Sequence, residues 1–400
     1  MSILASRPDG TTMRDPVGRY GGQLIGEDDI DAVGEALRSD WLTQGPLVAR
    51  FEAAMAEYLG ARYAVAVSSA TAGLHLASLA AGFGPGDEVV TSPISFVASA
   101  NCVAYTGAKP VFADIDPDTL GIDPAQVRAR TTAATKGVIA IHFAGHPCDM
   151  PAISAFAHER KLAVIEDAAH AVGTRYTVDG RTHRVGDCAH SDMAVFSFHP
   201  VKQMTTGEGG LVTTNRADLY ERLTQLRTHG ITRAPERMER NDGPWYYEQH
   251  ALGFNYRLTD LQCALGLSQL RKLDAFIARR REIVAAYNRA FAANDELITP
   301  TQRDGTEVSW HLYVLGFRGI DRRRAYDALR ARGLGVNVHY IPIHLQPYYR
   351  ERYGYAAGDF PQAERYYDRS LTIPLHPGLS DADVAQVIGS VNGVVAELRA

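Results

Sequence analysis

The chain has 400 residues, and hydrophobic residues make up 46% of it, which is enough for a large core and for more than one domain. Charged residues make up 22%, the formal net charge at pH 7 is −5, and no long block of one sign occurs. We therefore expect neither a nucleic-acid partner nor a membrane partner. The first residues lack the apolar run of a signal peptide, and no apolar run approaches the roughly 18 residues of a membrane span.

The cysteines and their neighbours bear on location and on metal binding. The four cysteines are far apart and form no C-x-x-C pair, which argues against structural disulfides and favours a cytoplasmic location. His142, His146 and Cys148 are close in sequence but match no zinc spacing. We therefore predict no metal site.

The first two helices follow a segment without periodicity. Residues 1–20 combine Pro, Gly and charge, and we interpret them as an N-terminal arm. Apolar residues at helical spacing predict a helix over 27–39 and another over 48–59, which Gly60 ends. Short apolar runs then alternate with helical stretches. Strands are predicted at 64–69, 88–92, 110–115, 137–145, 162–167, 193–198 and 210–214.

Several of these runs are continuously apolar, as in strands that are buried on both faces. This pattern predicts an α/β fold with a mainly parallel sheet covered by helices. Ligands in such sheets bind at the carboxyl ends of the strands, so functional residues should follow each run. The divisions we expect are an N-terminal arm at 1–20, a large domain at 21–260, and a linking helix with a small C-terminal domain at 261–400.

The later part of the chain mixes loop, helix and strand patterns. Residues 230–253 have little apolar periodicity and predict a long loop, and a helical stretch follows from about 259 to 291. The last hundred residues predict a smaller α+β domain. It would contain strands in SWHLYVLGF and LGVNVHYIP and two or three helices.

Hydroxyl-rich residues follow the first predicted strand, in SSATAGLH (68–75). Ser69, Thr71 and Gly73 would place hydroxyls and free amides at a helix N-terminus, which is a site for a phosphate. A simple Ser or Thr N-cap explains the same residues.

Two later strand ends carry an acid and a lysine. Asp167 ends LAVIED, where a buried carboxylate needs a cation or hydrogen bonds; a pyridinium nitrogen would serve, and a helix N-cap is the alternative. Lys202 lies between a strand and a glycine-rich turn in SFHPVKQMTTGEGG, and a desolvated lysine can form a Schiff base, although most lysines are surface charges. Ser197 could reach a phosphate. Phe96 could stack on an aromatic ring or belong to the core.

Four motifs match one family jointly: SSATAGLH, EDAAHAVGT, SFHPVK..TTGEGG and GFNYRLTDLQCALGLSQL. From about Tyr20 to the C-terminus, the chain resembles the sugar-nucleotide aminotransferases of the DegT/DnrJ/EryC1/StrS family, which are fold-type I pyridoxal-phosphate (PLP) enzymes. The resemblance implies PLP as cofactor, pyridoxamine phosphate as its intermediate form, and a homodimer with shared active sites.

The resemblance also implies roles for individual residues. Lys202 would be the catalytic residue that bonds to the cofactor, Asp167 would bind the pyridine nitrogen, and His170 would lie near the phenolic oxygen. His170 stands where the family has either His or Gln. The remaining cofactor-binding residues implied are Ser69, Ala70, Thr71, Phe96, Ser197 and, from the neighbouring subunit, Asn255.

Three stretches, SDWLTQGP, HFAGHPCDM and NVHYIPIHLQPYY, resemble the branch of the family that works in the pseudaminic acid pathway. That branch implies transfer of an amino group from glutamate to C4 of a UDP-linked 4-keto-6-deoxy-N-acetylhexosamine. The substrate-binding residues expected from these stretches and from position are Thr43, Gln44, Arg233, Arg257, His339, Tyr340 and His344. Packing in a turn is the alternative for His339 and His344, which are five residues apart and separated by Pro342.

Other functions share this fold. A dTDP- or GDP-linked keto-sugar could replace the UDP-sugar. A PLP-dependent keto-sugar dehydratase would carry His in place of the lysine, whereas this chain has both His199 and Lys202. A non-catalytic regulator would carry an added DNA-binding domain, for which an arm of 20 residues is too short.

Overall fold

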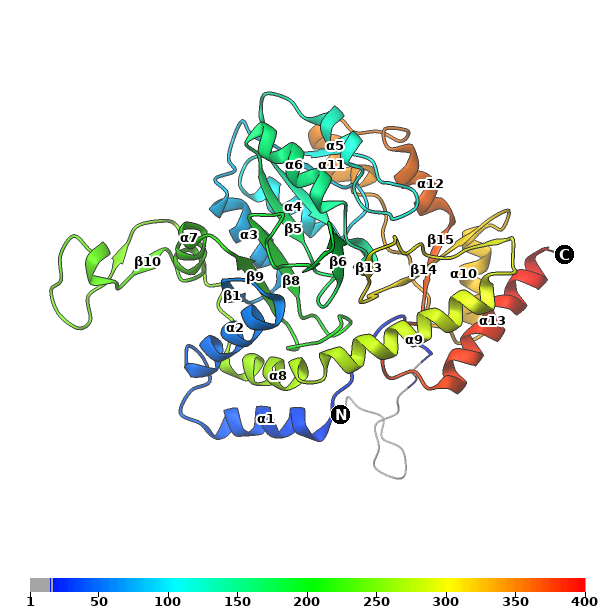
Figure 1. Ribbon diagram of the computed structural model, residues 1–400, viewed down its shortest axis with the longest axis horizontal. Helices are drawn as coiled ribbons and strands as arrows, with labels where there is room; N and C mark the ends of the chain where they lie inside the picture. The colour runs from blue at the N-terminus through cyan, green and yellow to red at the C-terminus, as the bar shows by residue number, and fades with distance from the viewer. Residues whose placement is uncertain (1–14, 16, 400) are drawn as a thin grey trace.

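A seven-stranded sheet forms the centre of the computed structural model, which describes residue 15 and residues 17–399 (Figure 1). Within that sheet β9 runs antiparallel to the other six strands, which are parallel to one another. The predicted mainly parallel sheet is therefore confirmed. In spatial order the strands are β1 (Tyr63–Val67), β9 (Gly210–Thr214), β8 (Met193–Ser197), β5 (Ala163–Asp167), β4 (Thr135–Ile141), β2 (Glu88–Thr91) and β3 (Lys109–Phe112).

Helices cover both faces of this sheet, because alternate residues of each strand point to opposite sides and nearly all are apolar. Val65, Ile165 and Val195 pack against one set of helices: α3 (Ala70–Ala80), α4 (Ala98–Tyr105) and α7 (Ala217–Arg227). Ala66 and Val164 pack against the other: α2 (Pro46–Leu59), α5 (Pro124–Arg130) and α6 (Met150–Arg160).

A helical ridge runs beneath the sheet and into the small C-terminal unit (Figure 1). The stretch predicted as one helix from 259 to 291 is two helices, α8 (Asp260–Leu270) and α9 (Leu273–Phe291). A capping box starts α8, since Thr259 and Gln262 bond to each other's amides. Helix α1 (Glu27–Arg38) packs on α8.

The C-terminal unit has its own three-stranded antiparallel sheet of β12 (Leu297–Ile298), β14 (Tyr313–Phe317) and β15 (Ser370–Ile373). The predicted strand in SWHLYVLGF is β14. The strand predicted in LGVNVHYIP is wrong: Asn337 makes an isolated bridge with Thr372, and Pro342 has no amide to continue a ladder. The helices here are α10 (Arg322–Ala331), α11 (Pro347–Tyr353), α12 (Pro361–Arg369) and α13 (Asp381–Arg399).

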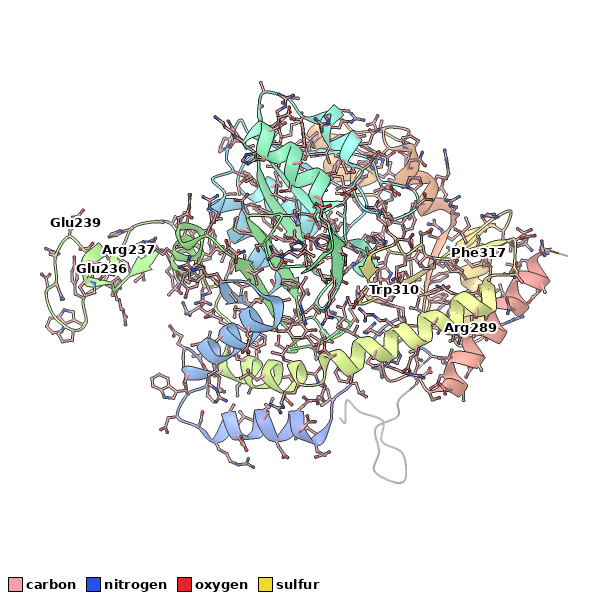
Figure 2. The ribbon with its side chains drawn as sticks, viewed as in Figure 1. Glu236, Arg237, Glu239, Arg289, Trp310 and Phe317 are labelled. Carbon is pink, nitrogen blue, oxygen red and sulfur yellow. The ribbon has the colours of Figure 1, made fainter. Side chains whose placement is uncertain are left out.

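Smaller elements complete the described chain. The predicted loop at 230–253 contains the strands β10 (Ile231–Thr232) and β11 (Glu248–Gln249), and it projects away from the body at Glu236, Arg237 and Glu239 (Figures 1 and 2). A second small sheet pairs β6 (Arg175–Val178), β7 (Arg181–Arg184) and β13 (Thr306–Glu307).

The N-terminal segment is described from Val17 onward and at Asp15; the rest of the predicted arm lies outside the described residues. Val17 accepts a backbone hydrogen bond from Gly335, and Tyr20 accepts one from Leu375. These residues therefore attach to the C-terminal unit. All four thiols are free and buried. Among the described helices, none combines the length and the apolarity that crossing a membrane requires.

Candidate active site

A cavity of about 520 Å³ lies at the carboxyl ends of β1, β2, β5 and β8. Loops of the C-terminal unit close its other side. Predicted residues from four separate strand ends line it together, as the strand-end rule requires. Those residues are Ser69, Ala70, Thr71, Phe96, Asp167, His170, Ser197 and Lys202, joined by His339 and Tyr340.

The turn from β1 into α3 forms one wall. The Ser69 hydroxyl accepts from the Ala72 amide at 3.1 Å, so Ser69 is the N-cap of α3. The amides of Ala70 and Thr71 precede the first bonds within the helix, and both residues line the cavity. Gly210 lets β9 pass close by, since a Cβ there would lie 2.6 Å from the Ala70 nitrogen. The N-cap alternative is thus present, and it leaves two amides free for an anion.

Asp167 is a buried carboxylate without an ion-pair partner among the described residues. Its Oδ2 accepts from the Ser99 hydroxyl at 2.6 Å, and its Oδ1 accepts from the Ala169 amide at 3.2 Å. Burial raises the pKa of Asp167, and these hydrogen bonds oppose that rise. A carboxylate in this setting gains from a cationic N–H placed against it, such as a protonated pyridine nitrogen.

Lys202 is the one Lys or Arg side chain among the residues that line the cavity. Burial lowers its pKa from 10.5 to about 7, against the attraction of Asp167. A lysine with such a pKa supplies a large fraction of free amine at neutral pH, which nucleophilic attack on a carbonyl carbon requires.

A backbone hydrogen bond fixes the tautomer of the neutral His170 ring. Its Nδ1 accepts from the Ala144 amide at 3.3 Å, so a neutral ring carries its proton on Nε2. That Nε2 lies 3.4 Å from the Tyr340 hydroxyl. Burial, followed by the charge of Lys202, holds the pKa of His170 well below its usual value. His170 is therefore a hydrogen-bond donor toward the cavity.

Aromatic rings line the remaining wall. Phe96 is 57% exposed, so it is not a core residue, and its ring centroid lies 6.1 Å from that of Tyr340. Tyr20 packs edge-on against His339 at 4.6 Å, and His311 lies 4.3 Å from His170.

Ser99, Tyr20 and His311 also line the cavity, and the sequence did not predict them. Ser99 lies one helical turn after Phe96, and that spacing was the one available signal for it. Tyr20 and His311 follow no predicted strand, and the packing of the C-terminal unit brings them to the cavity.

Six predicted residues lie outside the cavity. Asn255, Thr43, Gln44 and Arg233 are exposed, and Arg257 is half-buried beside the end of β1, with Val67 as its bridge partner.

His344 is fully buried. Its Nε2 bonds to Glu364 at 2.9 Å, and its ring packs on Phe360. In this position His344 does not line the cavity, which differs from the substrate contact expected for it. The turn around Pro342 rotates His344 away from the cavity that His339 lines.

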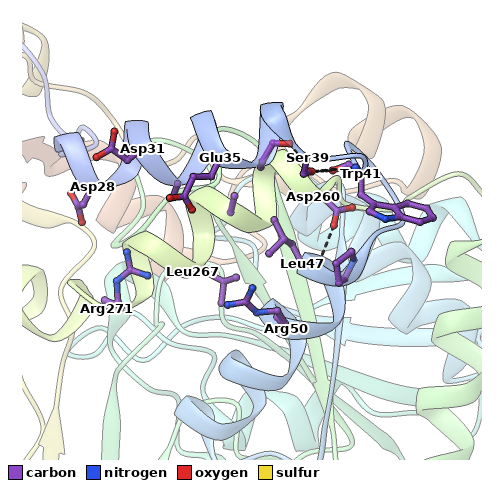
Figure 3. A pocket seen from close by; sticks show the side chains of 14 residues that line it. Asp28, Asp31, Glu35, Ser39, Trp41, Leu47, Arg50, Asp260, Leu267 and Arg271 are labelled. Atoms are coloured by element: carbon purple, nitrogen blue, oxygen red, sulfur yellow. Dashed lines mark hydrogen bonds between the residues drawn. The ribbon is translucent and has the colours of Figure 1, made fainter.

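A second hollow of about 540 Å³ lies between α1, α2 and α8 (Figure 3). Asp31 and Glu35 of α1 face Arg50 and Arg271 across it. At its floor Asp260 accepts from the Gly45 and Leu47 amides at 2.7 and 2.9 Å, which fixes the turn that presents Thr43 and Gln44. No lysine is among the residues that line this hollow, whereas Lys202 lines the first cavity.

Among the residues that the structure describes, no three His, Cys, Asp or Glu side chains are grouped as metal ligands. His142 Nε2 bonds to the buried Glu166 at 2.7 Å and its Nδ1 accepts from the Cys148 amide. His146 accepts from the Arg303 amide. These histidines are satisfied structural groups.

Comparisons with known proteins agree with this chemistry. A sequence model of the DegT/DnrJ/EryC1/StrS aminotransferase family matches residues 23–392. Spore coat polysaccharide biosynthesis protein SpsC of Bacillus subtilis (strain 168) is 45% identical over 381 residues, which are 94% of this chain and 96% of SpsC.

Two solved structures share the fold closely. PseC of Helicobacter pylori, an aminotransferase involved in the biosynthesis of pseudoaminic acid, is 30% identical with a TM-score of 0.85, over 94% of this chain and 99% of PseC. Spr1654 of Streptococcus pneumoniae, solved in PLP and PMP forms, is 29% identical with a TM-score of 0.88 in the PMP form, over 95% of this chain and 99% of Spr1654. The chain belongs to the DegT/DnrJ/EryC1/StrS aminotransferase family and is a PLP-dependent sugar aminotransferase.

Proposed function

We propose that this enzyme transfers an amino group from glutamate to C4 of a nucleotide-linked 4-keto-6-deoxy sugar, with Lys202 as its catalytic base. The observation that carries the proposal is the partly desolvated Lys202 in one cavity with Asp167. A free amine near neutral pH is the form that can bond to the cofactor and can then accept a proton.

The cavity residues divide the remaining work. PLP, when bound, supplies an electron sink for the bond that breaks at the amino-bearing carbon. Asp167 would hold the pyridine nitrogen, Ser69, Ala70, Thr71 and Ser197 would hold the phosphate, Phe96 would cover the ring, and His170 would donate from Nε2 to the phenolic oxygen. Freed Lys202 would take a proton from the donor's carbon in the first half-reaction and would act on the sugar carbon in the second.

We infer a homodimer with shared sites, and the charges of the lining residues support this. The lining residues offer one cation, Lys202, while His311 and His339 are kept neutral by burial, which lowers both pKa values. Cofactor phosphate, a dicarboxylate donor and a nucleotide diphosphate need more positive charge than this. The half-buried Arg257 would supply positive charge from a second copy, and the exposed Asn255 of that copy would add a neutral amide donor.

The UDP-linked N-acetylhexosamine is our first choice of substrate. The likeness to PseC supports it, whereas the higher identity to SpsC keeps dTDP- and GDP-linked keto-sugars as alternatives within the same reaction. The dehydratase alternative is disfavoured because Lys202 occupies the cavity and His199 is exposed at its rim. We place the enzyme in the cytoplasm, where nucleotide sugars serve as substrates.

The test uses purified holoenzyme and its visible spectrum. Adding glutamate should convert the bound cofactor to its pyridoxamine form, and a panel of UDP-, dTDP- and GDP-linked 4-keto sugars should regenerate the starting spectrum with one of them. Aspartate and alanine serve as donor controls. An undiminished glutamate half-reaction in Lys202→Ala would overturn the assignment of Lys202.

A further inference from the structure

Arg280 of α9 is a buried cation without a carboxylate partner among the described side chains. It is 0% exposed, and no ion pair includes it. Burial lowers its pKa to about 10, which leaves it charged at neutral pH. A charge in this position is costly unless several acceptors compensate for the lost water.

The acceptors are main-chain carbonyls of segments that form the cavity. One terminal nitrogen, Nη1, donates to the carbonyls of Trp310, His311 and Leu375 at 3.2, 3.3 and 3.0 Å. The other, Nη2, donates to the carbonyl of Lys202 at 3.4 Å. One guanidinium thus joins the loop after β8, the loop before β14 and the residues after β15.

The side chain next to Lys202 adds a second attachment to the same region. Gln203 Nε2 donates to the carbonyl of His170 at 2.5 Å and to the hydroxyl of Ser309 at 3.0 Å. The backbone at Lys202 is therefore attached in two ways, through its own carbonyl, which accepts from Arg280, and through the side chain of Gln203. Arg280 is the one charged group in this arrangement, and it comes from the helix that links the two units.

We propose that Arg280 is a positioning residue that holds Lys202 in its desolvated place by binding the lysine carbonyl together with those of Trp310, His311 and Leu375. Arg280 touches neither substrate nor cofactor in this role. The inference rests on the proposed role of Lys202 and is independent of the donor and of the nucleotide sugar.

The fork of the guanidinium explains why the residue is arginine. Arginine offers five N–H donors in a plane and can bind several carbonyls at once, whereas a lysine ammonium is a compact point charge with three donors. Arg280→Lys therefore keeps the charge and loses the simultaneous attachment. Without that attachment the loop after β8 should loosen, and water should reach the amine of Lys202.

The readout is the reactivity of Lys202 in the full-length chain freed of cofactor. Labelling with an amine-reactive reagent is followed by mass spectrometry across pH, and the midpoint for Lys202 should lie near pH 7 in the wild type. Because burial is what depresses that midpoint, it should rise by about one pH unit or more in Arg280→Lys and in Arg280→Met. The neighbouring Arg279, which pairs with Glu282 and Asp381 at the surface, supplies the control Arg279→Lys, whose midpoint should not move.

Each of the following outcomes would contradict either the role of Arg280 or the role of Lys202. A lower melting temperature in folded Arg280→Lys with an unmoved midpoint would show a structural role only and would overturn the proposal. An equal rise in Arg279→Lys would also overturn it. A wild-type midpoint near 10.5 would instead refute the role of Lys202 itself. If Arg280→Met fails to fold, Arg280→Lys decides.

Discussion

The hydroxyl of Ser99 should set the ionisation of Asp167, and Ser99→Ala tests this directly. The substitution removes a 2.6 Å hydrogen bond to the carboxylate and leaves the Ala169 amide at 3.2 Å as its remaining partner. A hydrogen bond to a charged group contributes about 1.5–3 kcal/mol, which corresponds to about one to two pKa units.

The direction of the pKa change in Ser99→Ala follows from the environment of Asp167. Burial already raises the pKa of Asp167, and the bond from Ser99 is the largest opposing influence. Its removal should raise the pKa further, so that a larger share of Asp167 is protonated at moderately acidic pH. Protonated Asp167 cannot hold a pyridinium nitrogen, and the rate of amino transfer should therefore fall on the acid side.

The assay is the pH dependence of the glutamate half-reaction, measured by stopped-flow absorbance. We expect the acid limb of the profile to move up by about one pH unit and the rate at its foot to fall about tenfold. Ser95→Ala is the matched control, because Ser95 bonds to the Ser99 hydroxyl at 2.7 Å and does not bond to Asp167. An unmoved acid limb in Ser99→Ala, with the cofactor fully bound, would refute the reasoning.

Three further results are expected. Gly210→Ala should weaken cofactor binding and cost about 1–3 kcal/mol of stability, because its Cβ would lie 2.6 Å from backbone atoms of the phosphate turn, whereas Gly389→Ala, which meets no atom within 4 Å in the exposed middle of α13, should raise the melting temperature slightly. The stability of the cofactor-free enzyme should rise between about pH 7 and pH 10, because the unfolded chain binds a proton at Lys202 in that range and the folded chain does not; Lys202→Met should lack this contribution in pH-dependent denaturant melts. Mixed dimers of Lys202→Ala and Asn255→Ala subunits should regain about half of the wild-type activity, since one of the two sites would then be intact, and no regain would contradict a shared site.

The sequence was sufficient for the residues that directly follow buried strands. Asp167 and Lys202 were predicted because a parallel sheet brings its carboxyl ends to one edge, and the two side chains do line one cavity. Ser69 was predicted for the same reason. The joint order of these motifs then identified the family.

Contacts between distant segments were out of reach. Ser99 bonds to Asp167 across a helix–strand contact, and Arg280 bonds to the Lys202 carbonyl from a helix 78 residues later. Neither contact leaves a periodic trace in sequence. His344 was expected to contact the substrate because it lies in NVHYIPIHLQPYY, but the turn at Pro342 places it in the interior, where it bonds to Glu364.

The position of β9 has a consequence for how the chain is made. In the seven-stranded sheet β9 is the one neighbour of β1, and Val67 pairs with Gly210. The backbone hydrogen bonds of β1 can therefore form only after β9 has been synthesised. The cavity can form only later, because the residues that line it extend in sequence from Tyr20 to Tyr340. A complete site for PLP therefore exists only after residue 340 has been synthesised. Pairing over such separations is slow, so the edge of β1 stays unpaired while residues 68–209 are synthesised.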